Sequence, residues 1–151
     1  NGPVCNCGNR GCLETFCSTT ALFARLQAAG IPVSYQDIYG SDPNEAAIAE
    51  LTAAFTSGDE AVTSCLQSYG RDLCCAVVSL VNLLDVRAVR LGGFPYLLGE
   101  PFAELLRSTL AKEFHILTST GALNLQLFDC KYEDVRKAAV LQTLEAIFSK
   151  H

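Results

Sequence analysis

The sequence has no excess of basic residues and no apolar run long enough to cross a membrane. With 11 Lys and Arg against 16 Asp and Glu, its net charge of −5 provides no basic surface for nucleic-acid phosphates. The longest apolar run, near 74–84, is shorter than the roughly 20 residues of a membrane span, and Ser79 and Asn82 interrupt it. This segment is therefore not expected to bind nucleic acid by itself or to enter a membrane.

Several catalytic and targeting signatures are also missing. The first residues are polar and contain glycine, proline and cysteine, unlike a secretory signal peptide. The sequence has no lysine-bearing phosphate loop, and no Ser/His/Asp or Cys/His arrangement is visible. We therefore predict no catalytic residue. What is present is a globular composition, 50% hydrophobic and 18% charged over 151 residues, which fits one domain with a real core.

Cysteine is abundant, and the even count of 8 allows a disulfide interpretation. However, Cys65, Cys74 and Cys75 lie in a strongly helical segment, where a free cysteine behaves as a small hydrophobic residue. Cys5 and Cys7 are too close to pair without strain. The chain is also larger than most disulfide-stapled scaffolds. We predict a reduced, cytoplasmic protein rather than a secreted one.

Three cysteines are gathered at the start of the chain, as Cys5-x-Cys7-x4-Cys12. Gly8 and Gly11 between them allow the sharp backbone turns that would bring the thiolates together. Three thiolates can converge on one tetrahedral metal ion, and a structural zinc site needs four such ligands. The spacing predicts a zinc site that takes three of its ligands from this loop.

The spacing does not determine which residue is the fourth ligand, or what role the acidic residue after the cluster has. A fourth ligand would come from upstream of Asn1 or from His115, since the other histidine, His151, is the last residue. Glu14 either interacts with the dipole of a following helix or accepts hydrogen bonds from a polar ligand beside the cluster.

The apolar periodicity predicts a helix-rich α/β fold with a small parallel sheet. Helices are expected over 13–29, 42–55, 59–84, 101–110 and 132–148, the second half of 59–84 being buried all round. Short strands are expected over 88–91 and 114–117, with a third extended piece over 122–128. So few strands make a small sheet, which suggests part of a larger fold. Gly92 and Gly93 after a strand let the backbone approach a ligand, as in nucleotide sites, or simply make a tight turn.

The opening cluster carries a resemblance to a known family. Residues 5–14, Cys-Asn-Cys-Gly-Asn-Arg-Gly-Cys-Leu-Glu, resemble the CxCGxxGCxE signature of the ROK family of repressors, open reading frames and sugar kinases. Residues 80–93 resemble the family's LVNLLNPEVVVLGG segment. The whole chain is similar to the C-terminal half of a ROK protein, so we interpret 1–151 as one partial domain, the C-terminal lobe, with the zinc motif 5–14 at its start.

The resemblance implies an actin-like (ribonuclease H-like) fold with two α/β lobes around a sugar cleft. It implies that Cys5, Cys7 and Cys12 hold zinc together with an upstream histidine, and that Glu14 hydrogen-bonds sugar hydroxyls. The expected effector is a sugar or sugar phosphate, and the expected assembly is a homo-oligomer. The family's upstream histidine, phosphate loop, catalytic Asp and N-terminal winged helix-turn-helix do not occur in this sequence. We therefore expect this chain neither to phosphorylate a sugar nor to contact DNA except through a further domain.

Two branches of the family remain candidates. Kinases usually carry a third glycine at the adenosine turn, whereas Phe94 and Pro95 follow Gly92 and Gly93 here. Lys137-Ala138-Ala139 stands where a Gly-Ala-Ala segment is usual, and 98–102 resemble the regulators. We favour the sugar-sensing and oligomerising part of a transcriptional regulator, the alternative being the C-terminal lobe of an ATP-dependent sugar kinase.

Overall fold

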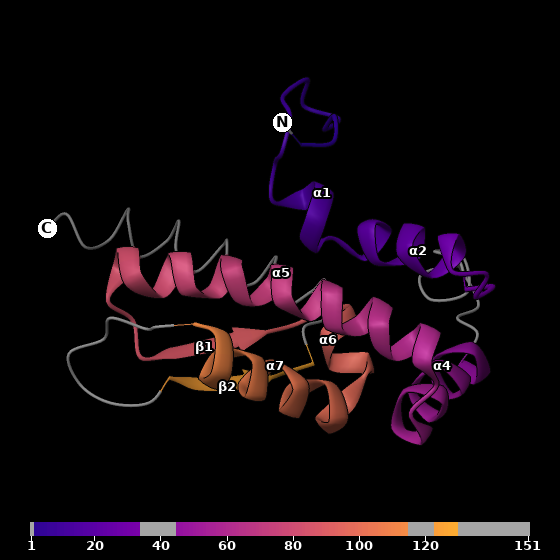
Figure 1. Cartoon of the computed structure of the whole chain (residues 1–151). Helices are drawn as coiled ribbons and strands as arrows, with labels where there is room; N and C mark the ends of the chain where they lie inside the picture. The colour runs from indigo at the N-terminus through magenta and orange to yellow at the C-terminus, as the bar shows by residue number, and fades with distance from the viewer. Residues whose placement is uncertain (1, 34–44, 115–122, 130–151) are drawn as a thin grey trace, which may run out of the picture.

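A long central helix organises the molecule, as the computed structural model in Figure 1 shows for residues 2–33, 45–114 and 123–129. This helix, α5, has the first two helices on one side and the sheet with the later helices on the other. The helices are α1 (Glu14–Cys17), α2 (Thr19–Ala28), α4 (Glu45–Ser57), α5 (Glu60–Leu84), α6 (Phe94–Leu97) and α7 (Gly99–Glu113); the strands are β1 (Ala88–Leu91) and β2 (Asn124–Leu127).

The start of α5 follows the sequence prediction. Gly58 adopts a positive φ of 82° and ends α4, a conformation that glycine tolerates without a steric penalty. The Asp59 carboxylate then accepts a hydrogen bond from the Val62 backbone N–H at 2.9 Å, which caps α5. The α4–α5 connection is thus a helix stop followed at once by a helix start.

The helix predicted over 13–29 is broken, which corrects the expectation of one continuous helix. Ser18 is extended, with φ −76° and ψ 160°, and its Oγ accepts a hydrogen bond from the Ala21 N–H at 3.1 Å. Serine favours this capping position because its side chain satisfies a backbone donor that the first helical turn leaves free. The apolar periodicity continues across the break, so periodicity alone did not reveal it.

The sheet consists of two parallel strands, β1 and β2, in register from Ala88 with Asn124 to Leu91 with Leu127. The chain passes through α6 and α7 between the two strands, and their parallel pairing confirms the small parallel sheet expected from the sequence. The pairing strand is the third extended piece expected over 122–128. Phe114 ends α7 in an extended conformation, and the rest of the expected 114–117 strand lies outside the described residues.

The segment after β1 differs from the prediction of a single helix from Pro101. A separate turn of helix, α6, begins at Phe94 and has Pro95 in its first turn. Proline has no backbone N–H, and the first turn of a helix does not use one for its own hydrogen bonds. α7 begins two residues before Pro101, at Gly99. Short helices of four residues carry too little periodicity to be recognised from sequence.

The core lies between α5 and the elements on either side of it. Phe23 of α2 meets Phe94 of α6 edge to face, with ring centroids 5.3 Å apart. Tyr69 of α5 stacks on Phe102 of α7 at 6.0 Å. At Gly70 an added Cβ would stand 3.2 Å from the Leu106 side chain, so α5 and α7 approach closely at that point.

Polar contacts fasten α1 and α2 to α5. Arg25 of α2 forms an ion pair with Asp72 of α5 at 2.5 Å, and the same nitrogen donates to the Phe16 carbonyl at 3.3 Å. The Tyr69 hydroxyl donates to the Cys17 carbonyl at 3.1 Å. Both contacts lie next to the break at Ser18, so they fix the angle at which α1 leaves α2.

The C-terminal end of α5 is more exposed than its apolar sequence predicts. Leu80, Leu83 and Leu84 are 49%, 79% and 61% exposed, which corrects the expectation of a helix buried all round. The start of the predicted 42–55 helix and the predicted helix over 132–148 lie outside the described residues.

Asp59 offers a direct test of the α5 cap. Asp59→Ala should lower the free energy of unfolding by about 1 kcal/mol, because the Val62 N–H loses its acceptor. Asp59→Asn keeps a capping oxygen and should stay within about 0.5 kcal/mol of the parent protein. Urea denaturation followed by circular dichroism measures both; equal losses for the two variants would contradict the capping role.

Candidate metal centre

The cysteine loop has its own backbone scaffold. Val4 and Arg10 form an isolated antiparallel bridge, and the Cys5 N–H donates to the Asn9 carbonyl at 2.8 Å. Gly8, at the tip, has a φ of 87°, which strains any residue with a side chain. These contacts fold the loop back on itself, so that residues far apart in the motif return to the same place.

The two ends of the loop meet at a pair of glycines. A Cβ added to Gly2 would lie only 2.5 Å from the Gly11 Cα, and Gly11 itself has a φ of 71°. The Gly11 N–H donates to the Pro3 carbonyl at 2.9 Å, which closes the loop. Glycine is therefore required here for backbone contact as well as for conformation.

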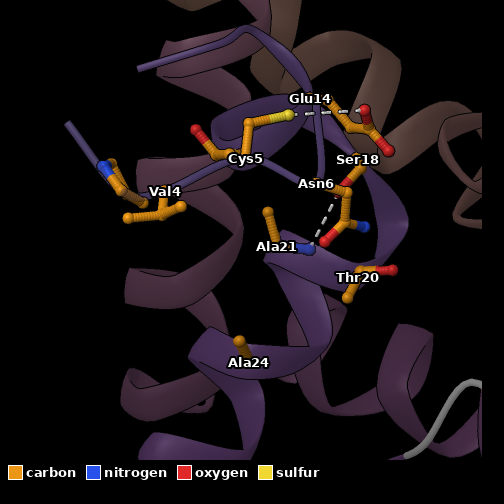
Figure 2. Close-up of a pocket in the computed structure, with 10 residues that line it drawn as sticks. Val4, Cys5, Asn6, Glu14, Ser18, Thr20, Ala21 and Ala24 are labelled. Atoms are coloured by element: carbon orange, nitrogen blue, oxygen red, sulfur yellow. Dashed lines mark hydrogen bonds between the residues drawn. The ribbon is translucent and has the colours of Figure 1, made fainter. Parts of the chain in front are cut away.

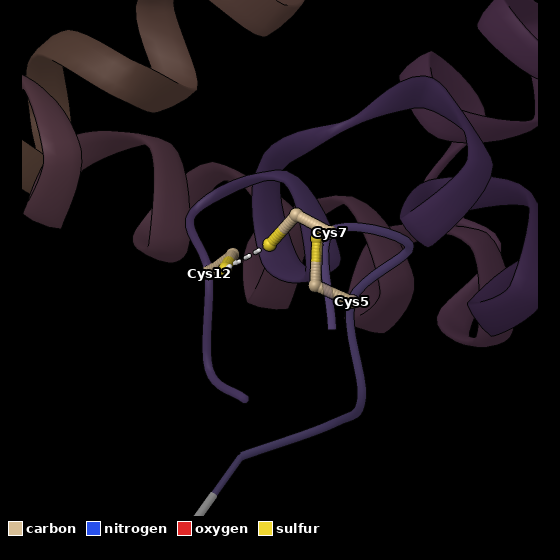
Figure 3. Close-up of side chains that lie close together, drawn as sticks. All are labelled: Cys5, Cys7 and Cys12. Carbon is tan, nitrogen blue, oxygen red and sulfur yellow. Dashed lines mark hydrogen bonds between the residues drawn. The ribbon is translucent and has the colours of Figure 1, made fainter. Parts of the chain in front are cut away.

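The loop brings the three predicted thiols together, as Figure 3 shows. The Sγ atoms of Cys5, Cys7 and Cys12 all lie within 4.8 Å of one another, and the Cys7 and Cys12 sulfurs are 3.6 Å apart. Sulfurs bound to one tetrahedral zinc at about 2.3 Å would be separated by about 3.8 Å. The donor set therefore fits a metal ion that prefers thiolates. Cys5 is buried, Cys12 is half-buried and Cys7 is exposed.

Cys7 and Cys12 differ in acidity. Hydrogen bonds from the Asn9 backbone and then from the neighbouring thiols stabilise the thiolate of Cys7 and lower its pKa. The hydrogen bonds of Cys12 with Cys7 and Cys5 favour its protonated form and raise its pKa to about 11. Of these two thiols, Cys7 therefore forms the thiolate more readily, and the thiolate is the form that binds a metal.

Glu14 connects the cluster to a neighbouring pocket. Its Oε2 lies 3.9 Å from the Cys5 sulfur, and its side chain lines an open pocket of about 280 Å³ (Figure 2). The Cys12 carbonyl accepts hydrogen bonds from the Thr15 N–H at 2.9 Å and hydroxyl at 2.7 Å. These bonds attach the loop directly to α1 and set the position of Glu14 in its first turn.

The pocket contains polar groups that the sequence analysis did not identify. Asn6 comes from the cysteine loop, and Thr20 comes from the first turn of α2 beyond the break. Both lie within a few residues of the motif, but nothing in their local pattern distinguishes them from ordinary loop and cap residues. The break at Ser18 turns the chain so that α2 can form one wall of the pocket.

Gly92 and Gly93, the weak candidates for a nucleotide turn, lie elsewhere. They connect β1 to α6, and Gly93 has a φ of 72° with open space where a Cβ would point. The pocket of about 290 Å³ near that edge is lined by other residues, among them Tyr96, Gly99 and Gln126. The structure therefore brings Glu14 to the cysteines and does not bring the two glycines to them.

Of the remaining described cysteines, Cys17, Cys65 and Cys74 pack in or against the core, whereas Cys75 is exposed. All seven described cysteines are free thiols, as the reduced interpretation predicts. Burial, reinforced by the Asp72 carboxylate, raises the pKa of Cys17 to about 11, and burial raises the pKa of Cys74 to about 12. Buried thiols with raised pKa values are poor nucleophiles and poor metal ligands.

Among the helices of the described residues, none has both the length and the apolar composition of a membrane span.

Proteins with similar sequences include both repressors and sugar kinases. A xylose repressor of Bacillus spizizenii is 35% identical over 89 residues, which are 59% of this chain and 20% of the repressor. An N-acetylmannosamine kinase of Haemophilus influenzae is 30% identical over 93 residues, 62% of this chain and 27% of the kinase. The chain thus spans between 20% and 27% of the length of these two relatives.

A solved structure and a family model also match this chain. The structure of a ROK hexokinase from Thermus thermophilus matches with a TM-score of 0.65 and 26% identity, over 96% of this chain and 46% of that one. The likeness confirms the predicted fold class, a helix-rich α/β arrangement with a small parallel sheet belonging to the actin-like fold of ROK proteins. The ROK family model matches residues 1–120, well over half of the sequence, and the chain therefore belongs to the ROK family.

Proposed function

We propose that residues 1–151 are the C-terminal lobe of a sugar-sensing ROK transcriptional regulator. The observation that carries this proposal is the position of Glu14, which lies between the thiol cluster and the 280 Å³ pocket. A carboxylate on a pocket wall accepts hydrogen bonds from hydroxyl groups, the recurrent feature of sugars. The ligand class is a sugar or a sugar phosphate.

Zinc is the metal that suits the cluster. Three sulfur ligands at separations near those of a tetrahedral site match its preference for thiolates. The fourth ligand, which the family resemblance assigns to a histidine, would come from outside the described residues. When bound, the ion would supply structural rigidity. The bonds from Thr15 to the Cys12 carbonyl would then keep the first turn of α1, and Glu14 with it, in one orientation toward the pocket.

The environment of Phe94 favours a regulator over a kinase. Phe94 occupies the position where kinases of the family usually carry a third glycine, and here it is buried against Phe23 in the core. A phenylalanine anchored in the core lacks the conformational freedom that a third glycine would give this turn for close approach to a nucleotide. In a regulator the sugar would favour one arrangement of the lobes and so move a DNA-binding domain outside this segment.

The alternative is the C-terminal lobe of a sugar kinase, and one pocket favours it. About 290 Å³ of space lies beside the C-terminal end of β2, between Gln126 and the start of α7 at Gly99. Ligands of α/β folds bind at this edge of a parallel sheet. Assaying the intact protein for ATP-dependent phosphorylation of D-xylose and N-acetylmannosamine decides between the two: turnover supports the kinase, and sugar binding without turnover supports the regulator.

Glu14→Gln tests the sugar-contacting role. Losing the charged acceptor should weaken sugar binding by the intact protein at least tenfold, because hydrogen bonds to a carboxylate are stronger than those to an amide. Calorimetric titration with D-xylose and N-acetylmannosamine measures this. Glu60→Gln, at the start of α5, removes the same charge outside the pocket and serves as the control. Unchanged affinity in Glu14→Gln would rule out this contact.

Cys7→Ser tests the metal. The intact protein should contain close to one zinc per chain, and Cys7→Ser should lose it, since a hydroxyl is a poor zinc ligand. Cys75→Ser, an exposed thiol outside the cluster, should keep its zinc. Elemental analysis of the purified variants measures the content. Zinc retained by Cys7→Ser would contradict the assignment.

A homo-oligomer remains a prediction, for which the exposed end of α5 provides apolar surface. Light scattering of the intact protein should give the mass of a dimer or larger assembly. Leu83→Lys should shift that mass toward the monomer with little loss of fold, since the side chain is 79% exposed. A parent protein that is monomeric at high concentration would contradict the prediction.

A further inference from the structure

A polar groove lies between α5 and α7, away from the cysteine loop. It has a volume of about 440 Å³, within the usual range for small-molecule sites. Its walls carry four hydroxyl side chains, and its rim carries charged groups near the C-terminal end of α7. The hydroxyls belong to Ser64, Ser68, Ser108 and Thr109.

These hydroxyls are free of the partners that helical Ser and Thr usually take. Several such side chains elsewhere bond back to a carbonyl one turn earlier, as Thr52 does to Ile48 at 2.9 Å and Ser79 to Cys75 at 2.8 Å, although Thr63 of α5 does not. Within the described part of the chain, none of the four groove hydroxyls makes a side-chain hydrogen bond of this kind. Their donors and acceptors are available to a ligand.

Thr109 is the most informative of the four. It is 9% exposed and is the one polar residue classed as buried among the described residues. Its hydroxyl has no hydrogen-bond partner within the described part of the chain. Its oxygen is not among the fully enclosed atoms that lack a hydrogen bond, so it remains accessible. A ligand that enters the groove can therefore reach this hydroxyl and exchange a hydrogen bond with it.

The charges at the groove are positive on balance. Arg71 is paired with Glu113 at 2.8 Å, which uses the carboxylate on this side. Lys112 lines the same groove, and no described carboxylate pairs with it. Two cations and one anion therefore line the groove, on a chain whose net charge is −5. An ammonium group beside several hydroxyl donors is suited to the oxygens of a phosphate.

We infer that the α5–α7 groove binds the phosphate group of a small phosphorylated metabolite. Thr109 and the neighbouring serines donate hydrogen bonds to its oxygens, and Lys112 supplies the countercharge. The space beyond one phosphate accommodates a short organic part. This site is separate from the pocket at Glu14 and does not depend on the proposed sugar-sensing role.

Calorimetry of the intact protein with glycerol 3-phosphate, inorganic phosphate and glycerol tests the inference. We expect glycerol 3-phosphate to bind at least tenfold more tightly than glycerol and more tightly than inorganic phosphate. Equal affinity for the two phosphates would overturn the assignment to a metabolite. Binding of neither would overturn the site.

Variants locate the binding. Thr109→Val removes the hydroxyl at nearly constant volume, and Lys112→Gln removes the charge; each should weaken glycerol 3-phosphate binding about tenfold. Thr109→Ser should keep affinity within about twofold. Arg87→Gln, which removes an exposed cation outside the groove, should bind as the parent does. Affinity unchanged in both Thr109→Val and Lys112→Gln would overturn the inference. Because Lys112 is exposed, Lys112→Gln should fold normally and can test the site even if Thr109→Val is unstable.

Discussion

The attachment of α2 to α5, in which the ion pair between Arg25 and Asp72 joins a set of buried apolar residues, is the constraint that places the cysteine loop. The two side chains are 24% and 33% exposed, so water screens the pair only in part. Removing either partner would leave a half-buried charge without compensation. The loop is closed by its own backbone bonds and contributes few side chains to the core, with Cys5 as its buried member. Its position relative to α5 therefore follows from the packing of α2 in the core, to which this pair and the bond from Tyr69 to Cys17 add fixed polar contacts.

α5 separates two kinds of site. On one side, the break at Ser18 and the first turn of α1 place a carboxylate between sulfur ligands and a pocket. On the other side, α7 and α5 form a groove of hydroxyls and cations. The first site is built by residues close together in the sequence, and the second by residues about forty positions apart. The two can therefore vary independently while sharing one structural support.

That difference explains how much the sequence could predict. The Cys5-x-Cys7-x4-Cys12 spacing and its glycines act within one loop, so their convergence followed from local geometry. The cap at Asp59 and the long helix after it also have local causes. The break at Ser18 was missed because the apolar pattern continues across it. The groove at Thr109 could not be foreseen, because it exists only where two distant helices pack.

The glycine at position 70 has a consequence for how the molecule deforms. Because Gly70 has no side chain, the side chains of α7 pack directly against the backbone of α5, and an added Cβ would meet the Leu106 side chain at 3.2 Å. Close-packed interiors transmit displacement rather than absorb it. A shift of α7, which also packs on β2, would therefore carry α5 with it as one rigid unit. The sheet edge and the cysteine loop are thus mechanically connected through a residue that has no side chain.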